Sequence, residues 1–348
     1  MSSVAYPIGS DSSGIRQGVT CMLVGMWLFV GQDVLMKGLL GAQPLWMLIS
    51  ARAIVAVVIL VPLIASLKGQ HRLYTRLWPV HLIRAFLFTA GFAMFYAAFP
   101  FMGLAEVSAI FFSAPLFTAI LAVVFLNERL GIHRIGAVLL GFVGVVIAIA
   151  PSHGDFQWIA LLPLICAVFY ASSMILTRRV GQGESSLTMG LWTIGFSGLL
   201  IWPIGWVTNK AMTIGPEFDH LRLELVVPDA AQVVQLGVLG LVGMGGYILV
   251  NRAYQVASAG LIAPFDYSYL PFAALMAWLL WDEVPGSRTL VGMSLIVGAG
   301  LYLGYRELRA IRQPGKPAPV GEAVFTTSVP VVVEMTVQHS GDDVGSRD

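Results

Sequence analysis

The sequence predicts an all-α integral membrane protein whose ten transmembrane helices form two inverted five-helix repeats. Of its 348 residues, 57% are hydrophobic and only 11% are charged, whereas a soluble domain typically carries about 25% charged residues. The apolar residues gather in ten runs, each close to the roughly 20 residues that a helix needs to cross the hydrocarbon core. The third observation is that the two halves of the chain resemble each other.

The ten predicted spans follow one another with short polar breaks. Backbone polar groups in hydrocarbon must be satisfied internally, so long and uniformly apolar runs should be helices rather than the alternating strands of a barrel. The predicted ranges are Gly18–Leu35, Pro44–Leu67, His81–Phe101, Val107–Leu126, Ile132–Ala150, Phe156–Thr177, Leu187–Val207, Ala231–Val250, Leu261–Trp281 and Leu290–Tyr305. A polar tail over residues 1–16 precedes them. Residues 313–348, which are rich in Pro, Gly, Ser and acids, predict a disordered tail.

The distribution of lysine and arginine predicts the orientation. With the N-terminus inside, thirteen Lys and Arg residues, Arg84 among them, fall on the cytoplasmic side and four fall outside. Both termini are therefore expected in the cytoplasm, and the protein is expected in the cell (cytoplasmic or inner) membrane. The first residues lack the basic region of a signal peptide, and no clear cleavage site follows the first apolar run. We therefore expect this run to be a retained span.

An internal repeat supports the division into two halves, residues 17–151 and 156–309. The stretch Phe117–Glu128 aligns without gaps on Phe272–Glu283, and Ser113 falls on Ser268. With one extra residue in the following loop, Gly136 and Gly144 fall on Gly292 and Gly300. Each half holds five predicted spans, and an odd number inverts the second half relative to the first. Inverted repeats are typical of secondary transporters, whose site lies between the repeats near the bilayer midplane.

The repeated motif carries a family resemblance. The segments APLFTAILAVVFLNERLGIHRIGAVLLGFVGVVIAIAP and LPFAALMAWLLWDEVPGSRTLVGMSLIVGAGLYLGYRE resemble the EamA domain repeat of the ten-span branch of the drug/metabolite transporter superfamily. The resemblance covers about residues 17–309 and implies this fold and the transport of small organic metabolites. It marks Glu128 and Glu283 as family signature positions. DVLMK at 33–37 and Arg52 in SARAIVA are similar to the subgroup that includes S-adenosylmethionine and riboflavin carriers. Those two solutes and amino acids or related compounds are the substrates that the resemblance implies.

Two ionisable residues inside predicted spans are candidates for substrate binding or coupling. Arg52 would anchor a substrate anion, pair with a carboxylate in the bundle, or extend along the helix to the interface. Asp266, between Pro264 and Pro271, would bind a proton or a cationic group. The alternative is an ion pair with Arg52 or Arg252 that stabilises packing. Prolines free backbone carbonyls, which often accompanies transporter sites.

Further candidates lie at span ends and among the aromatic residues. Asp33 and Lys37 are four residues apart, which favours a local ion pair at the interface, with an outer gate as the alternative. Glu128 and Glu283 would orient loops at opposite faces. Tyr and Trp favour interfaces, but the mid-span Tyr247, Tyr267 and Trp192 are expected to line a cavity because buried donors need partners. Asn251 at the end of the eighth span would reach the cavity from inside.

The function that these patterns predict is secondary-active transport of a small organic metabolite by alternating access. Protons are one candidate coupling ion, with facilitated exchange as the alternative. The protein is expected to lie among membrane lipids, as a monomer or a homodimer. No cofactor, metal site or nucleic-acid partner is expected, because no catalytic or nucleotide-binding motif occurs and the net charge is only +1. The alternative is a polytopic membrane enzyme acting on lipids, which would need catalytic groups at one face, where Asp282 and Glu283 or Asn127 and Glu128 lie.

Overall fold

The structure, a computed structural model, describes residues 12–67, 72–126, 132–149, 158–180, 184–211, 215–256 and 262–311. Every regular element in these residues is helical. The α-helices are α1 (Ser12–Leu39), α2 (Leu45–Ser66), α3 (Trp78–Ala97), α4 (Leu104–Phe111), α5 (Ala114–Leu126), α6 (Ile132–Ile149), α7 (Leu161–Val180), α8 (Ser186–Ala211), α9 (Ala230–Val256), α11 (Tyr269–Trp281) and α12 (Ser287–Ile311). Three short 3-10 helices accompany them: η1 (Trp158–Ala160), η2 (Pro216–Leu221) and η3 (Ala263–Ser268).

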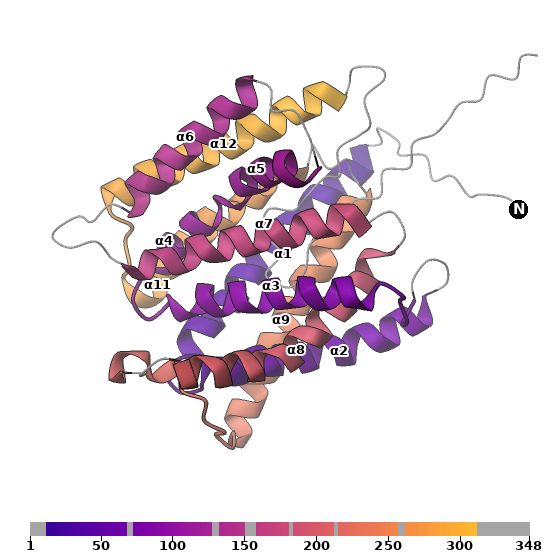
Figure 1. Ribbon diagram of the computed structural model, residues 1–348, viewed down its shortest axis with the longest axis vertical. Coiled ribbons are helices and arrows are strands. Elements are labelled where there is room, and N and C mark those ends of the chain that lie inside the picture. The colour runs from indigo at the N-terminus through magenta and orange to yellow at the C-terminus, as the bar shows by residue number, and fades with distance from the viewer. Residues whose placement is uncertain are drawn as a thin grey trace, which may run out of the picture.

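The helices form a bundle in which α6 and α12 pair at one edge and α2 packs on α8 at the opposite edge (Figure 1). Seven helices in the described residues are long and apolar enough to cross a membrane: those in α1, α2, α3, α4–α5, η1–α7, α8 and α9. The chain is therefore a multi-pass membrane protein. The other three predicted spans coincide with α6, whose apolar part is the shorter Ile135–Ile149, and with α11 and α12. A count of ten crossings stays a prediction.

The fourth and ninth predicted spans are interrupted rather than continuous. α4 ends at Phe111 and α5 begins at Ala114, whereas η3 ends at Ser268 and α11 begins at Tyr269. In the repeat alignment Ala114 falls on Tyr269, and α5 and α11 each have 13 residues. Both begin with a proline in their first turn, Pro115 and Pro271, where the missing N–H costs nothing but a continuous helix would be disrupted. The two halves therefore break the same helix at the same position.

Close backbone contact joins α6 to α12, the last long helix of each half. A Cβ added to Gly144 would lie 2.8 Å from the carbonyl oxygen of Gly292, and one added to Gly292 would lie 2.6 Å from that of Gly144. Only glycine at both positions lets the axes approach so closely, and small residues are how helices associate in lipid.

A cluster of aromatic residues packs inside the bundle, and several aliphatic residues lie on its outer faces. Phe92 of α3 packs against Phe111 of α4 with ring centroids 5.6 Å apart and against Tyr170 of α7 at 6.3 Å. Ile54 and Val146 are exposed on the outer faces of their helices, as suits contact with lipid. Polar side chains that are buried between the helices therefore have no water nearby and must find partners in the protein.

Candidate functional site

A buried carboxylate joins α1, α3 and α11 inside the bundle. Asp33 is 0% exposed. Its Oδ1 accepts hydrogen bonds from the Tyr96 hydroxyl at 3.0 Å and from Gln32 Nε2 at 3.1 Å, and its Oδ2 accepts one from the Tyr269 hydroxyl at 2.6 Å. Burying a carboxylate is costly unless it is hydrogen-bonded and its charge is balanced. Donors on α1, α3 and α11 supply the hydrogen bonds that this carboxylate needs.

The balancing positive charge comes from α2. Arg52 is 5% exposed, and its Nη1 donates to the Tyr96 hydroxyl at 2.9 Å. Its guanidinium also lies 5.6 Å from the centroid of the Tyr96 ring, within cation–π range. The Tyr96 hydroxyl therefore accepts from Arg52 and donates to Asp33, so that it bridges the two charges. The sequence singled out both charges, but it assigned Asp33 to Lys37 and did not single out Tyr96.

The interrupted ninth span places the third donor. Tyr269 is the first residue of α11, and its hydroxyl reaches both Asp33 on α1 and the Ser108 Oγ of α4, the latter at 3.4 Å. Both repeats thus contribute, with Tyr269 from the second half and the other groups from the first. We call this set the central network: Gln32, Asp33, Arg52, Tyr96, Ser108 and Tyr269.

The expected local pair between Asp33 and Lys37 is replaced by a longer-range one. Lys37 Nζ forms an ion pair with the carboxylate of Glu283 and donates to the Met102 carbonyl oxygen at 3.3 Å. The other oxygen of Glu283 accepts from the Leu104 backbone N–H at 3.2 Å. Asp33 instead turns into the bundle, where buried donors satisfy it, so the local helical pair was the wrong interpretation. Glu128, the counterpart of Glu283, lies outside the described residues.

A cavity of about 820 Å³ opens at this end of the bundle. Its walls come from segments 40–44, 99–106, 217–226 and 277–285, which the predicted topology places outside, so we call it the outer cavity. Its walls carry more acidic than basic groups: Glu106, Glu217, Asp219, Glu224 and Glu283 against Lys37. Since Lys37 lies one helical turn after Asp33 on α1, the central network lies one turn below the outer cavity.

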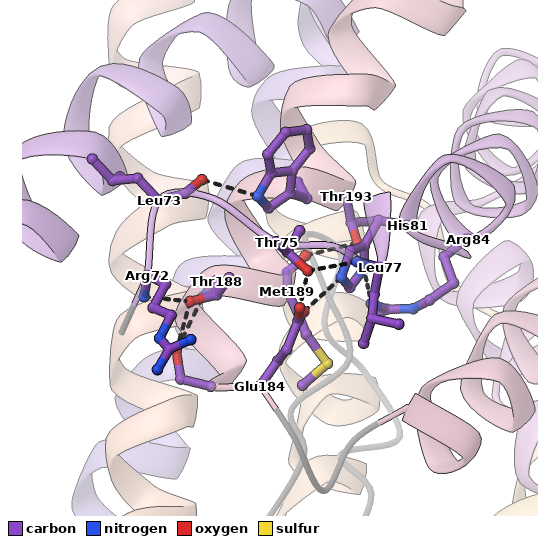
Figure 2. Close-up of polar contacts among 12 residues, drawn as sticks. Arg72, Leu73, Thr75, Leu77, His81, Arg84, Glu184, Thr188, Met189 and Thr193 are labelled. Carbon is purple, nitrogen blue, oxygen red and sulfur yellow. Dashed lines mark hydrogen bonds and ion pairs between the residues drawn. The ribbon is translucent and has the colours of Figure 1, made fainter. Parts of the chain in front are cut away.

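Polar contacts tie the segments together at the opposite end (Figure 2). Glu184 accepts a hydrogen bond from Thr75 Oγ1, and its Oε2 lies 2.6 Å from Nε2 of His81. Nδ1 of His81 lies 3.0 Å from Nη1 of Arg84. We call Thr75, His81, Arg84 and Glu184 the inner closure, because it joins the start of α3 to the segment before α8. Arg84 served only as an orientation charge in the sequence, but it is 0% exposed.

The ninth-span candidates have partners outside the central network. Asp266 is 0% exposed in η3, and its Oδ2 accepts a hydrogen bond from the Tyr254 hydroxyl at 3.3 Å. Tyr267 packs its ring against Phe112 at a centroid distance of 5.3 Å. Arg52 contacts Tyr96, which connects it to Asp33. The ion pair between Arg52 and Asp266, one of the alternatives for Asp266, is therefore not found at Arg52.

The three remaining candidates lie near the inner closure rather than around one central cavity. Trp192 Nε1 donates to the Leu73 carbonyl oxygen at 3.1 Å, and the Tyr247 hydroxyl donates to the Ser186 carbonyl oxygen at 2.8 Å. Asn251 Nδ2 donates to the backbone oxygen of Tyr247 at 2.9 Å. Their positions within the predicted spans did not reveal that these side chains donate hydrogen bonds to backbone carbonyl oxygens near the inner closure.

Comparison with known proteins gives a consistent result. A model of the EamA-like transporter family matches residues 16–150 and again residues 157–305. The chain is 28% identical to a riboflavin transporter of Vibrio cholerae over 74% of its own length and 82% of that protein. It is 28% identical to an S-adenosylmethionine uptake transporter of Rickettsia bellii over 73% of its length and 81% of that protein.

Two further similarities extend this picture. A pseudopaline exporter of Pseudomonas aeruginosa is 25% identical over 65% of this chain and 74% of its own length. A solved crystal structure of a protein aligns with 87% of this chain and all of its own with a TM-score of 0.54 at 18% identity, which supports the fold alone.

Proposed function

The chain belongs to the EamA-like transporter family, and from this premise we propose that it carries its solute by alternating access. It is a transporter of a small organic metabolite, as its relatives are. The observation that carries the proposed mechanism is an asymmetry between the two ends of the bundle. The outer cavity of about 820 Å³ is open, whereas hydrogen bonds to Glu184 tie the opposite end together. This arrangement suits an outward-open carrier that must break the inner closure to release its solute inside.

The central network is the proposed site of substrate or proton coupling. It lies between the outer cavity and the inner closure, and it joins both repeats through Asp33 and Tyr269. Its buried charges would change partners whenever a solute or a proton enters, because neither charge tolerates an empty low-dielectric site. We propose Asp33 and Arg52 as the coupling pair, and Asp266 as a second buried carboxylate that responds to protons.

The proposed topology has ten crossings in two inverted five-span halves. Both termini lie in the cytoplasm and the protein resides in the inner membrane. In this arrangement the Lys37–Glu283 pair lies at the outer mouth as a gate, and the inner closure faces the cytoplasm. We propose no catalytic activity, since Glu283, one of the carboxylates that a lipid enzyme would need, is occupied by Lys37 and the Leu104 backbone.

Riboflavin and S-adenosylmethionine are the proposed substrates to test first, because relatives that transport each of them match most of this chain. The purified full chain is reconstituted in liposomes, and uptake of each labelled solute is measured with and without a proton gradient. We expect uptake of at least one of them, and Asp33→Asn should abolish its dependence on the gradient. Absence of flux for both solutes and for amino acids would contradict the proposal.

A matched control separates the site from general damage. Asp229 precedes α9 and caps its first turn, because its Oδ1 accepts a hydrogen bond from the Gln232 backbone N–H at 2.8 Å. It is not a member of the central network. Asp229→Asn removes one charge but retains a capping oxygen, so it should leave flux unchanged. Equal loss of flux in Asp33→Asn and Asp229→Asn would show that the assay reports folding rather than coupling.

A further inference from the structure

One buried cation has more hydrogen-bonding capacity than its surroundings use. Arg84 lies on α3 with 0% exposure, and its Nη1 contacts Nδ1 of His81 at 3.0 Å. Its Nε and Nη2 have no hydrogen-bond partner within the part of the chain that the structure describes. Buried guanidinium groups normally satisfy most of their donors, so the two unused donors of Arg84 are available to a ligand or an ordered water.

The proton on His81 is fixed by its neighbours. A guanidinium has no acceptor, so Nη1 of Arg84 must donate and Nδ1 of His81 must accept. The ring proton is then on Nε2, which donates to Oε2 of Glu184 at 2.6 Å. A neutral ring therefore separates the Glu184 carboxylate from Arg84. The Nε–Nη2 edge of the guanidinium keeps the planar two-donor geometry that matches a carboxylate.

An unused acceptor lies in the same part of the bundle. Phe88 of α3 and Met244 of α9 line one small pocket, and Arg84 and Tyr247 lie about one turn from them on the same helices. The Tyr247 hydroxyl donates to the backbone oxygen of Ser186, two residues after Glu184, and the backbone oxygen of Tyr247 accepts from Asn251 Nδ2 at 2.9 Å. The other amide atom, Asn251 Oδ1, has no partner among the described residues, although the side chain is only 3% exposed. Arg84 on α3 and Asn251 on α9 thus present one unused cationic edge and one unused amide oxygen at the inner-closure end of the bundle.

We propose that Arg84 and Asn251 bind the amino-acid end of the transported solute. The Nε–Nη2 edge of Arg84 would bind its carboxylate, and Asn251 Oδ1 would accept from its ammonium group. The site becomes accessible when the inner closure opens. This inference rests on the proposed transport function and narrows it, because S-adenosylmethionine and amino acids carry this end whereas riboflavin does not.

The test measures ligand stabilisation of the full chain in lipid nanodiscs. The melting temperature is recorded with S-adenosylmethionine and with methionine, and then with the decarboxylated form of each, which lacks only the carboxylate. A ligand that binds the folded state raises this temperature according to its affinity. Proteins compared are the wild type, Arg84→Met, Arg84→Lys and the control Arg222→Met, whose arginine is partly exposed and pairs with Asp219 at 2.8 Å.

We expect the wild type and Arg222→Met to bind at least one carboxylate form about tenfold or more tightly than its decarboxylated partner, as suits a charge-assisted hydrogen bond. Arg84→Met should lose this preference and keep its weak binding of the decarboxylated forms. Arg84→Lys should retain part of the preference, because it keeps the charge but not the planar edge. Asn251→Leu should weaken binding of both forms equally, since both carry the ammonium group.

Two results would overturn the assignment. One is a wild type that does not distinguish the carboxylate from the decarboxylated forms, or binds neither. The other is a preference that survives in Arg84→Met. Riboflavin flux into proteoliposomes that contain the same protein variants separates this failure from failure of the proposed function. Flux with no carboxylate preference refutes the Arg84 site and leaves transport standing.

Discussion

Removing the Glu184 side chain should shift the protein toward an inner-open state. Glu184→Ala eliminates two hydrogen bonds, one from Thr75 and one from His81 at 2.6 Å. Hydrogen bonds to charged groups contribute about 1.5–3 kcal/mol each. Their combined loss therefore disfavours the inner-closed state by at least about 3 kcal/mol, which is a change of roughly 150-fold in the equilibrium between the two states.

Thiol labelling measures this shift directly. Met189 lies on α8 next to the closure and is 0% exposed, so a cysteine there is protected until the inner end opens. Met189→Cys is introduced after Cys21→Ser and Cys166→Ala have removed the native thiols. The rate of reaction with a membrane-impermeant maleimide is then followed from the side that carries the N-terminus. We expect Glu184→Ala to raise this rate by roughly 150-fold while the open state is a minor population, because the rate then follows that population.

A second carboxylate, in the outer cavity, serves as the control. Glu217 is an exposed carboxylate in the wall of the outer cavity, and Glu217→Ala should leave labelling at position 189 unchanged. A labelling rate that stays the same or falls in Glu184→Ala, with the protein still monodisperse in gel filtration, would refute the view that Glu184 holds the inner end closed.

Three further predictions concern stability. Tyr269→Phe removes the hydroxyl that donates at 2.6 Å to the carboxylate of the central network, so the unfolding free energy should fall by about 1.5–3 kcal/mol in chemical denaturation. Tyr267→Phe, two residues earlier, should cost less because it leaves this bond to the carboxylate intact. Gly144→Leu should lower the unfolding free energy by about 1–3 kcal/mol, because the new Cβ would lie 2.8 Å from the α12 backbone and force α6 away from it. A Cβ at Gly136 has nothing within 4 Å, so Gly136→Leu should leave the unfolding free energy unchanged in the same measurement. Burial lowers the pKa of His220 in η2 below its usual 6.5, so the unfolded chain takes up the proton first and stability falls as the pH drops below 6.5. Melting temperatures at pH 7.5 and 5 should therefore differ more for the wild type than for His220→Gln, and equal differences would exclude this residue as a source of acid sensitivity.

Much of the architecture followed from local patterns. The lengths of the apolar runs predicted α1, α2, α3, α7, α8 and α9 because a helix in lipid is set by its own residues. The family and its repeated unit followed from the glutamate-bearing span motif, which the match over residues 16–150 and 157–305 confirms. The same patterns did not show the interruptions before Ala114 and Tyr269, because proline in a first turn is compatible with either a start or a kink.

The functional groups were predicted less well than the fold. The sequence identified Asp33, Arg52 and Glu283 as rare charges in or beside spans, and those charges do form the polar contacts between helices. Their partners were not foreseen, because Tyr96 and Tyr269 are two aromatic residues among many. Glu184 was not identified either, since it falls in the break between two predicted spans. A signal for Arg84 was present, since His81 precedes it by one helical turn, but no local pattern says that both face inward.

The sequence by itself determined that this chain lives in a membrane, that it contains two related halves and that it is a transporter, because composition, periodicity and repeated motifs are properties of the chain taken in order. Only the tertiary structure decided which charges meet. Lys37 and Glu283 are 246 residues apart and Asp33 and Tyr269 are 236 apart, and such pairs are set by which helix faces pack together. In a low-dielectric interior a charge must be balanced by whatever that packing brings within reach, so the function of each charge depends on partners that sequence spacing cannot specify.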